Sequence, residues 1–279
     1  MEVFKFITGA ALLLAAAGVP AESQVPLQSP PLSYADLADL ALAAPVAAHV
    51  ELRRASALDR EQAAGIRPGE TRFYIEADIV SLIRGPGGMP ARVSYLVDVP
   101  NLANGRAPKL RKKAHHIVLG STVPGLAGEL RLAAPDAQIP FTQTAADRLR
   151  ALLREAARAD APPAITGIGR AFHVPGAIPG ESETQIFLQA ADGRPVSLTI
   201  LRRPGEMPRW AVALSEIVDE AAAAPAPDTL LWYRLACSLP AALPPSSLAA
   251  AEGAEGPAIQ ADYRFVRQQL GPCVRMRRR

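Results

Sequence analysis

The sequence lacks the short motifs by which most enzyme classes are recognised. No GxSxG or SxxK pattern offers an activated serine, and no HExxH, P-loop or EF-hand pattern offers a metal or nucleotide site. The Gly-rich stretch RGPGG at residues 84–88 is followed by no helical pattern, so it predicts a turn and not a phosphate-binding loop. These absences argue against the common hydrolases and nucleotide-binding proteins, and we expect no cofactor.

Lysine and aromatic residues are scarce. Phe, Trp and Tyr make up 5% of the 279 residues, whereas hydrophobic residues of all kinds make up 49%, so the core must consist mostly of Ala, Leu, Val and Ile. The formal net charge of +3 is close to balanced, and arginine is scattered outside residues 109–113 and the C-terminal tail. A dedicated nucleic-acid binder concentrates its basic residues on one surface. We therefore expect no nucleic-acid partner.

Long apolar runs are absent except at the N-terminus, which reads MEVFKFITGAALLLAAAGVPAES. Lys5 supplies a weakly positive start, residues 6–17 are apolar, and residues 19–21 are of the small kind that a signal peptidase reads. The apolar part is shorter than the ~20 residues that span a bilayer. We expect residues 1–21 to be a signal peptide, with an uncleaved anchor or a buried helix as the alternative. The mature chain should then have no transmembrane segment and lie in the periplasm or outside the cell.

Cysteine is rare, and both cysteines, Cys237 and Cys273, lie near the C-terminus. Two cysteines in an oxidising compartment predict one disulfide. Such a bond would hold the C-terminal segment to the second domain and stabilise the fold by about 4 kcal/mol in the chain-entropy model. Buried free thiols or a redox pair are the alternatives, although no CxxC motif supports the redox pair.

The first half of the chain predicts a β domain at residues 46–160. It follows a Pro-rich lead-in and short helix at 22–45, in which Ser33 caps the helix and Pro45 ends it. Five short strands with long loops predict a small antiparallel barrel or sandwich, with an OB-like barrel as the candidate form, and a helix follows from Thr144. Alternating apolar residues and turn signals place these strands near 46–52, 72–85, 91–100, 112–120 and 128–134.

The second half, residues 161–279, shows the same order of strands and then a helix. Segment 229–237 is interpreted as the fifth strand, with a short helix as the alternative. The final helix starts at Pro257 and is ended by Gly271 and Pro272, before a basic tail. The fold class is therefore mostly β (α+β), with two small antiparallel β domains that are each followed by a helix. The other four strands are predicted near 165–174, 183–190, 195–202 and 209–218.

The segment RKKAHHIVLG, residues 111–120, contains two adjacent histidines. Adjacent residues on a strand point to opposite faces, so His115 and His116 cannot both bind one metal ion there. A zinc site would require His49, His173 or distant carboxylates to converge. We therefore expect no metal site.

Lysines cluster just before these histidines, and on a strand Lys109, Arg111 and Lys113 would share one face. The first interpretation is a charged edge strand that resists aggregation. The second is a contact with an anionic partner, such as a polysaccharide or a lipid headgroup. Single-stranded nucleic acid is the third, but residues 105–135 contain no aromatic side chains on which bases could stack.

Residues 171–185 span the loop between two predicted strands of the second half and place His173 near Glu181 and Glu183 across that loop. A histidine beside two carboxylates can serve as an acid–base pair. The plainer interpretation is a long hairpin with a polar solvent face, and it is favoured because no nucleophile or metal set accompanies these residues.

The preferred function is therefore non-catalytic. We expect an exported periplasmic binding or envelope-interaction protein, with an envelope protein or an anionic surface as its partner. One alternative is a periplasmic hydrolase or other enzyme centred on His173, Glu181 and Glu183. Another is an accessory subunit of an envelope assembly, which predicts an exposed apolar patch.

Overall fold

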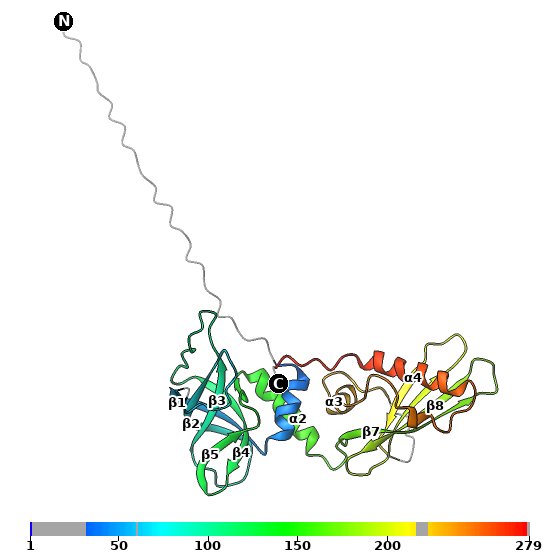
Figure 1. Cartoon of the computed structure of the whole chain (residues 1–279), viewed down its shortest axis with the longest axis horizontal. Coiled ribbons are helices and arrows are strands. Elements are labelled where there is room, and N and C mark those ends of the chain that lie inside the picture. The colour runs from blue at the N-terminus through cyan, green and yellow to red at the C-terminus, as the bar shows by residue number, and fades with distance from the viewer. Residues whose placement is uncertain (2–31, 60, 216–222, 278–279) are drawn as a thin grey trace. The chain divides into compact units, whose positions relative to one another are not determined.

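The computed structural model describes residues 1, 32–59, 61–215 and 223–277. The predicted signal peptide and most of the Pro-rich lead-in lie outside the described residues. Contacts divide the chain into Met1–Pro31 and one compact unit, Leu32–Arg279, which contains both β sheets (Figure 1). The predicted division of this unit into two domains near residue 160 stays a prediction.

The first helix, α1 (Tyr34–Ala43), begins where the sequence predicts it. Ser33 Oγ accepts a hydrogen bond from the backbone N–H of Asp36 at 3.0 Å, which satisfies one of the free donors of the first turn. Leu37, Leu40 and other apolar residues of α1 are buried, so the helix is held by packing as well as by its cap.

The first sheet, sheet A, has six strands, of which β1 to β5 close into a barrel, and this confirms the predicted barrel architecture (Figure 1). Its order is β1-β2-β3-β5-β4-β6, and a β1–β4 pairing closes it. The β3–β5 pairing is parallel and the other pairings are antiparallel. Alternate residues fill the interior, among them Leu52, Ile75, Tyr95 and Leu130. The strands are β1 (Val46–Ala57), β2 (Glu70–Arg84), β3 (Arg92–Pro100), β4 (His115–Val123), β5 (Leu126–Leu132) and β6 (Gln138–Pro140).

Strand β4 differs from its predicted form in a way that matters for function. It begins at His115 and not at residue 112, because Lys113 has a φ of 66° and closes a turn in which Ala114 N–H bonds to Arg111 O. The expectation that Lys109, Arg111 and Lys113 share a strand face was therefore wrong. Strand β4 also pairs with β1 on one side and with β5 and β6 on the other. It has no free edge for those cations to protect.

Helix α2 (Gln143–Ala156) links the barrel to sheet B, a four-stranded antiparallel meander of order β10-β9-β8-β7. Thr142 caps α2, and Leu149 and Leu152 on its apolar face are buried. The predicted turn at 192–193 joins β8 to β9, and the one at 204–205 joins β9 to β10. The strands are β7 (Ile165–Pro175), β8 (Ser182–Ala190), β9 (Val196–Arg202) and β10 (Arg209–Ala213).

The predicted fifth strand of the second half is a helix, α3 (Leu230–Ala236). Thr229 Oγ1 accepts from Trp232 N–H and starts the helix, and Trp232 Nε1 donates to the backbone O of Leu270 at 2.8 Å. The apolar run LLWYRLA is compatible with either structure, and packing selects the helix. After a 3₁₀ turn, η1 (Pro245–Leu248), the chain forms α4 (Glu255–Leu270), which ends at Gly271 with a φ of 70°.

Helices cover one face of sheet B. Buried residues of that face, such as Ile186 and Leu198, belong to the same core cluster as Ile259 and Val266 of α4. The sulfur atoms of Cys237 and Cys273 are 2.06 Å apart, so the disulfide expected from the sequence is present and joins the end of α3 to the segment after α4. No helix in the described part of the chain has the length and apolar character needed to cross a membrane.

Candidate functional site

A basic depression of about 400 Å³ lies on the barrel, between β1 and the loop before β4. We call it the basic pocket. Five of its eight lining residues are cations, which is an unusual concentration in a chain whose formal net charge is only +3. The lining residues are Leu52, Arg53, Arg54 and Ala55 from β1, and Lys109, Leu110, Arg111 and Lys112 from the loop.

Local backbone features bring the two halves of the basic pocket together. The register of β1 against β2 shifts between Leu52 and Arg54, and such a bulge adds a residue and bends the strand. The loop is tied back to β1 by Lys113 N–H to Leu52 O at 2.7 Å and by Leu52 N–H to Ala114 O at 2.9 Å. The cations therefore lie next to β1 although more than fifty residues separate the two segments in the sequence.

The cations of β1 are partly neutralised, but those of the loop are not. Arg53 lies 3.2 Å from Glu51 and 3.1 Å from Asp78, measured between nitrogen and carboxylate oxygen. Arg54 lies 3.9 Å from Glu76. Lys109, Arg111 and Lys112 form no ion pair within 4.0 Å with any residue that the structure describes. Three exposed positive charges of the pocket thus have no counter-ion within the described part of the chain.

The structure places the predicted anion-binding residues unequally. Lys109 and Arg111 line the basic pocket, whereas Lys113 does not, and Lys112 lies in the pocket instead. A strand model puts Lys112 on the opposite side from Lys109 and Arg111. The turn around Lys113 removes that alternation, and a turn in the left-handed region at a lysine has no clear sequence signal.

A second polar cluster lies beside the start of β4. His49 Nε2 and His115 Nδ1 are 3.0 Å apart, and His115 Nε2 is 3.8 Å from Glu51. The His49 ring stacks on Phe141 at 3.7 Å between centroids. Strand pairing, and not sequence adjacency, brings this pair of histidines together. In the part of the chain that the structure describes, no three or more His, Cys, Asp or Glu side chains form a metal-binding group.

Burial governs the protonation of two histidines in this region. It lowers the pKa of His116 from 6.5 to about 4, and the nearby His115 acts in the same direction, while a backbone hydrogen bond at Ala114 opposes it. Burial also lowers the pKa of His49, with smaller contributions from His115 and Arg150. Both imidazoles are therefore neutral near pH 7.

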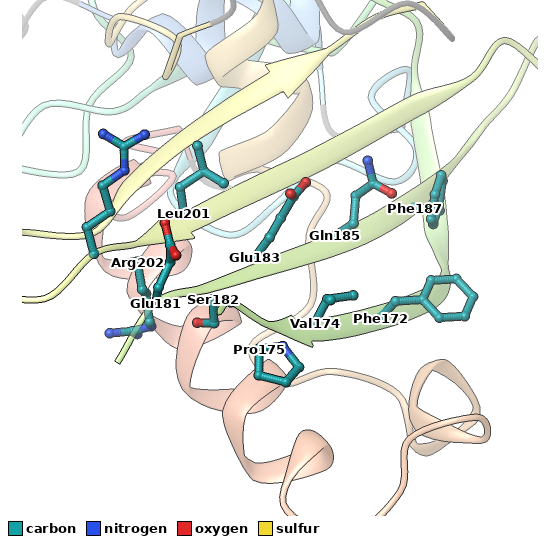
Figure 2. Close-up of a pocket in the computed structure, with 12 residues that line it drawn as sticks. Phe172, Val174, Pro175, Glu181, Ser182, Glu183, Gln185, Phe187, Leu201 and Arg202 are labelled. Carbon is teal, nitrogen blue, oxygen red and sulfur yellow. The ribbon is translucent and has the colours of Figure 1, made fainter. Parts of the chain in front are cut away.

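The predicted catalytic group of the second half is not brought together. Glu181 and Glu183 line an open concavity of about 510 Å³ on the face of sheet B opposite α4, together with Phe172 and Val174 (Figure 2). His173 alternates with Phe172 and Val174 along β7, and its side chain lies on the other face, toward α4. The sheet separates the imidazole from both carboxylates.

His173 instead joins a buried network that sequence reasoning missed. His173 Nδ1 is 2.8 Å from Thr184 Oγ1, and that hydroxyl donates to Asp262 of α4. Arg202 also donates to Asp262. Thr184 and Asp262 are both 0% exposed, so neither can touch a substrate, and the network fastens α4 to sheet B.

Comparison with known proteins adds no family. The chain matches no protein-family model, and a search of curated proteins finds no match. The basic pocket is the feature of the described residues whose chemistry points most directly to a ligand.

Proposed function

We propose that this chain is an exported, non-catalytic binding protein whose barrel holds an anionic group in the basic pocket. The observation that carries the proposal is that five cations line one depression and three of them have no counter-ion among the residues that the structure describes. Like charges gathered in one place destabilise a fold through repulsion. A bound anion would remove that cost and so stabilise the folded state.

The residue types favour phosphate or carboxylate oxygens as the ligand atoms. Arg111 can offer two parallel N–H donors to such a group, while Lys109 and Lys112 act as point charges on flexible stems. Phosphate and carboxylate groups occur on lipid headgroups and on acidic polysaccharides, the two anionic partners expected for an envelope protein. The shared chemistry is therefore a multiply charged oxyanion.

Two further observations support the exported, non-catalytic part of the proposal. A disulfide joins Cys237 and Cys273, and disulfides persist mainly in oxidising compartments outside the cytoplasm. His173 and Glu183 lie on opposite faces of sheet B, so the enzyme alternative gains no support from their placement.

The test compares two triple variants that remove the same charge. One carries Lys109→Gln, Arg111→Gln and Lys112→Gln in the basic pocket. The control carries Arg170→Gln, Arg203→Gln and Arg264→Gln, three exposed arginines outside the barrel. Binding is measured with pyrophosphate, with a polyuronate and with vesicles that contain phosphatidylglycerol, each at several salt concentrations.

We expect the pocket variant to weaken binding by about tenfold or more and to flatten its salt dependence, while the control stays close to wild type. The vesicle and polyuronate arms separate a lipid headgroup from a polysaccharide as the source. Equal losses in both triple variants would show only a general attraction to positive charge and would overturn the proposal. A finer pair is Lys112→Gln against Lys113→Gln, because only the first residue lines the pocket.

A further inference from the structure

The face of sheet B opposite α4 carries exposed apolar side chains. Phe172, Phe187 and Leu201 are 42%, 40% and 41% exposed, and Val174 is 62% exposed. The two phenyl rings meet edge to face with centroids 6.1 Å apart. Figure 2 shows these side chains projecting from three neighbouring strands. The solvent face of an antiparallel sheet is ordinarily polar, and an apolar one indicates an interaction surface.

Charges flank this apolar face in matching register. Glu183 on β8 and Arg209 on β10 each pair with Leu201 on β9, one from each side. In this row the side chain from β8 is acidic, the one from β9 is apolar and the one from β10 is basic. The side chain of Arg209 is 79% exposed, and its contact with Glu206, at 3.6 Å, lies at the surface and contributes little.

The next row of the same face differs in size across the strands. Gln185 on β8 and Ala211 on β10 both pair with Thr199 on β9. The long side chain of Gln185 therefore raises the surface on the β8 side, whereas the small side chain of Ala211 leaves it lower on the β10 side. A two-fold rotation about an axis parallel to β9 exchanges the β8 side with the β10 side. It would therefore place the raised β8 side of one copy over the low β10 side of another.

We propose that this face is the surface on which a second copy of the chain packs, with the two-fold axis parallel to β9 and midway between the two sheets. Rotation about that axis brings Glu183 of each copy over Arg209 of the other, and brings Leu201 against its own counterpart. Because β7 lies two strands from β9 and only β10 lies on the other side of β9 in sheet B, Phe172 and Val174 fall at the rim of this contact. A two-fold contact uses the same patch on both copies and closes on itself, as self-complementary charge requires. Two sheets packed face to face in this way lie about 10 Å apart, with their inward side chains forming the core.

This surface is independent of the basic pocket, because it lies on a different sheet and uses none of the same residues. Its occupant is tested by a charge exchange. Glu183→Arg alone and Arg209→Glu alone each place like charges opposite each other in the dimer. The double variant, Glu183→Arg with Arg209→Glu, restores opposite charges across the two-fold axis.

Sedimentation equilibrium of the purified protein measures the outcome. We expect wild type to reach twice the mass of one chain, each single variant to raise the dissociation constant about tenfold to a hundredfold, and the double variant to recover. Glu129→Arg, the same charge reversal at an exposed site on β5 of the barrel, is the matched control and should leave association unchanged. Thermal unfolding confirms that every variant is folded.

Three results would overturn the proposal. They are a monomeric wild type throughout the measurable concentration range, single variants that dimerise normally, and a double variant that fails to recover. If the wild type is monomeric, the apolar face would instead bind a different protein, as the accessory-subunit alternative predicts.

Discussion

The carboxylate of Asp262, on α4, accepts a hydrogen bond from the guanidinium of Arg202 at the end of β9. The same carboxylate accepts the hydroxyl of Thr184, which contacts His173 on β7. One buried carboxylate therefore links three strands to the helix that covers them. Because the exposed fraction of Asp262 is 0%, its charge depends on these partners for stabilisation.

The first prediction follows from that relationship. Asp262→Asn removes the charge that faces Arg202 and should lower the free energy of unfolding by about 1–2 kcal/mol, because the charge-assisted hydrogen bonds to the buried carboxylate are lost, whereas Arg202, which is 36% exposed, can be rehydrated. Urea unfolding monitored by circular dichroism measures the change. Glu129→Gln, the same replacement at an exposed site on β5, should stay within about 0.5 kcal/mol of wild type. Equal stability of Asp262→Asn and wild type would contradict a stabilising role.

The second prediction concerns the disulfide. Cys237 and Cys273 are 36 residues apart in sequence, and opening a loop of that size should cost about 4 kcal/mol. The bond also positions the tail, in which Arg275 pairs with Asp39 at 2.7 Å and Arg277 pairs with Asp136. We expect reduction to lower the urea midpoint and to speed tryptic cleavage after Arg275. An unchanged midpoint and cleavage rate in reductant would show that the bond is dispensable.

The third prediction is that the folded protein loses stability as the pH falls below about 6.5. The pKa of His116 is about 4 when folded and 6.5 ordinarily, so the unfolded chain binds more protons between those values. The stability that neutral His116 contributes is fully present above about pH 6.5 and is lost as pH falls toward 4, by at most about 3 kcal/mol.

The variant His116→Gln tests this assignment, because it removes the titrating group. Urea midpoints measured between pH 7.5 and 4.5 should fall less steeply in this variant than in wild type. The pH dependence that remains in the variant should include a contribution from His49, because burial also lowers the pKa of that residue. If the two slopes are equal, His116 is not the group responsible.

The fourth prediction tests the barrel. A methyl group on Gly120 of β4 would collide with the backbone carbonyl of Arg131 on β5, and backbone cannot move aside as a flexible side chain can. Gly120→Ala should therefore destabilise the protein by about 1–3 kcal/mol, the usual range for overpacking. Gly87→Ala is the control, because nothing lies within 4 Å of a side chain there. Similar thermal midpoints for both variants would contradict the close approach of β4 and β5.

Only part of each candidate site could be predicted from local patterns in the sequence. Lys109 and Arg111 were identified as anion-binding candidates because they stand out in a lysine-poor chain, and both line the basic pocket. Their partners from β1, Arg53 and Arg54, could not be found this way, because only strand pairing brings them near the loop. The His49–His115 contact and the link from Asp262 to sheet B have the same origin.

The amino-acid sequence by itself determined where several helices begin or end and where most strands lie. Ser33 starts α1, Gly271 ends α4, and alternating apolar residues with turn signals place most strands, because caps, turns and side-chain alternation act over a few residues. Tertiary structure alone decided that 230–236 is helical, that β4 lies inside a closed barrel, and that His173 faces away from Glu183. Those outcomes depend on which distant segments pack together, and a short apolar run is equally buried by a strand or a helix until its partners are in place.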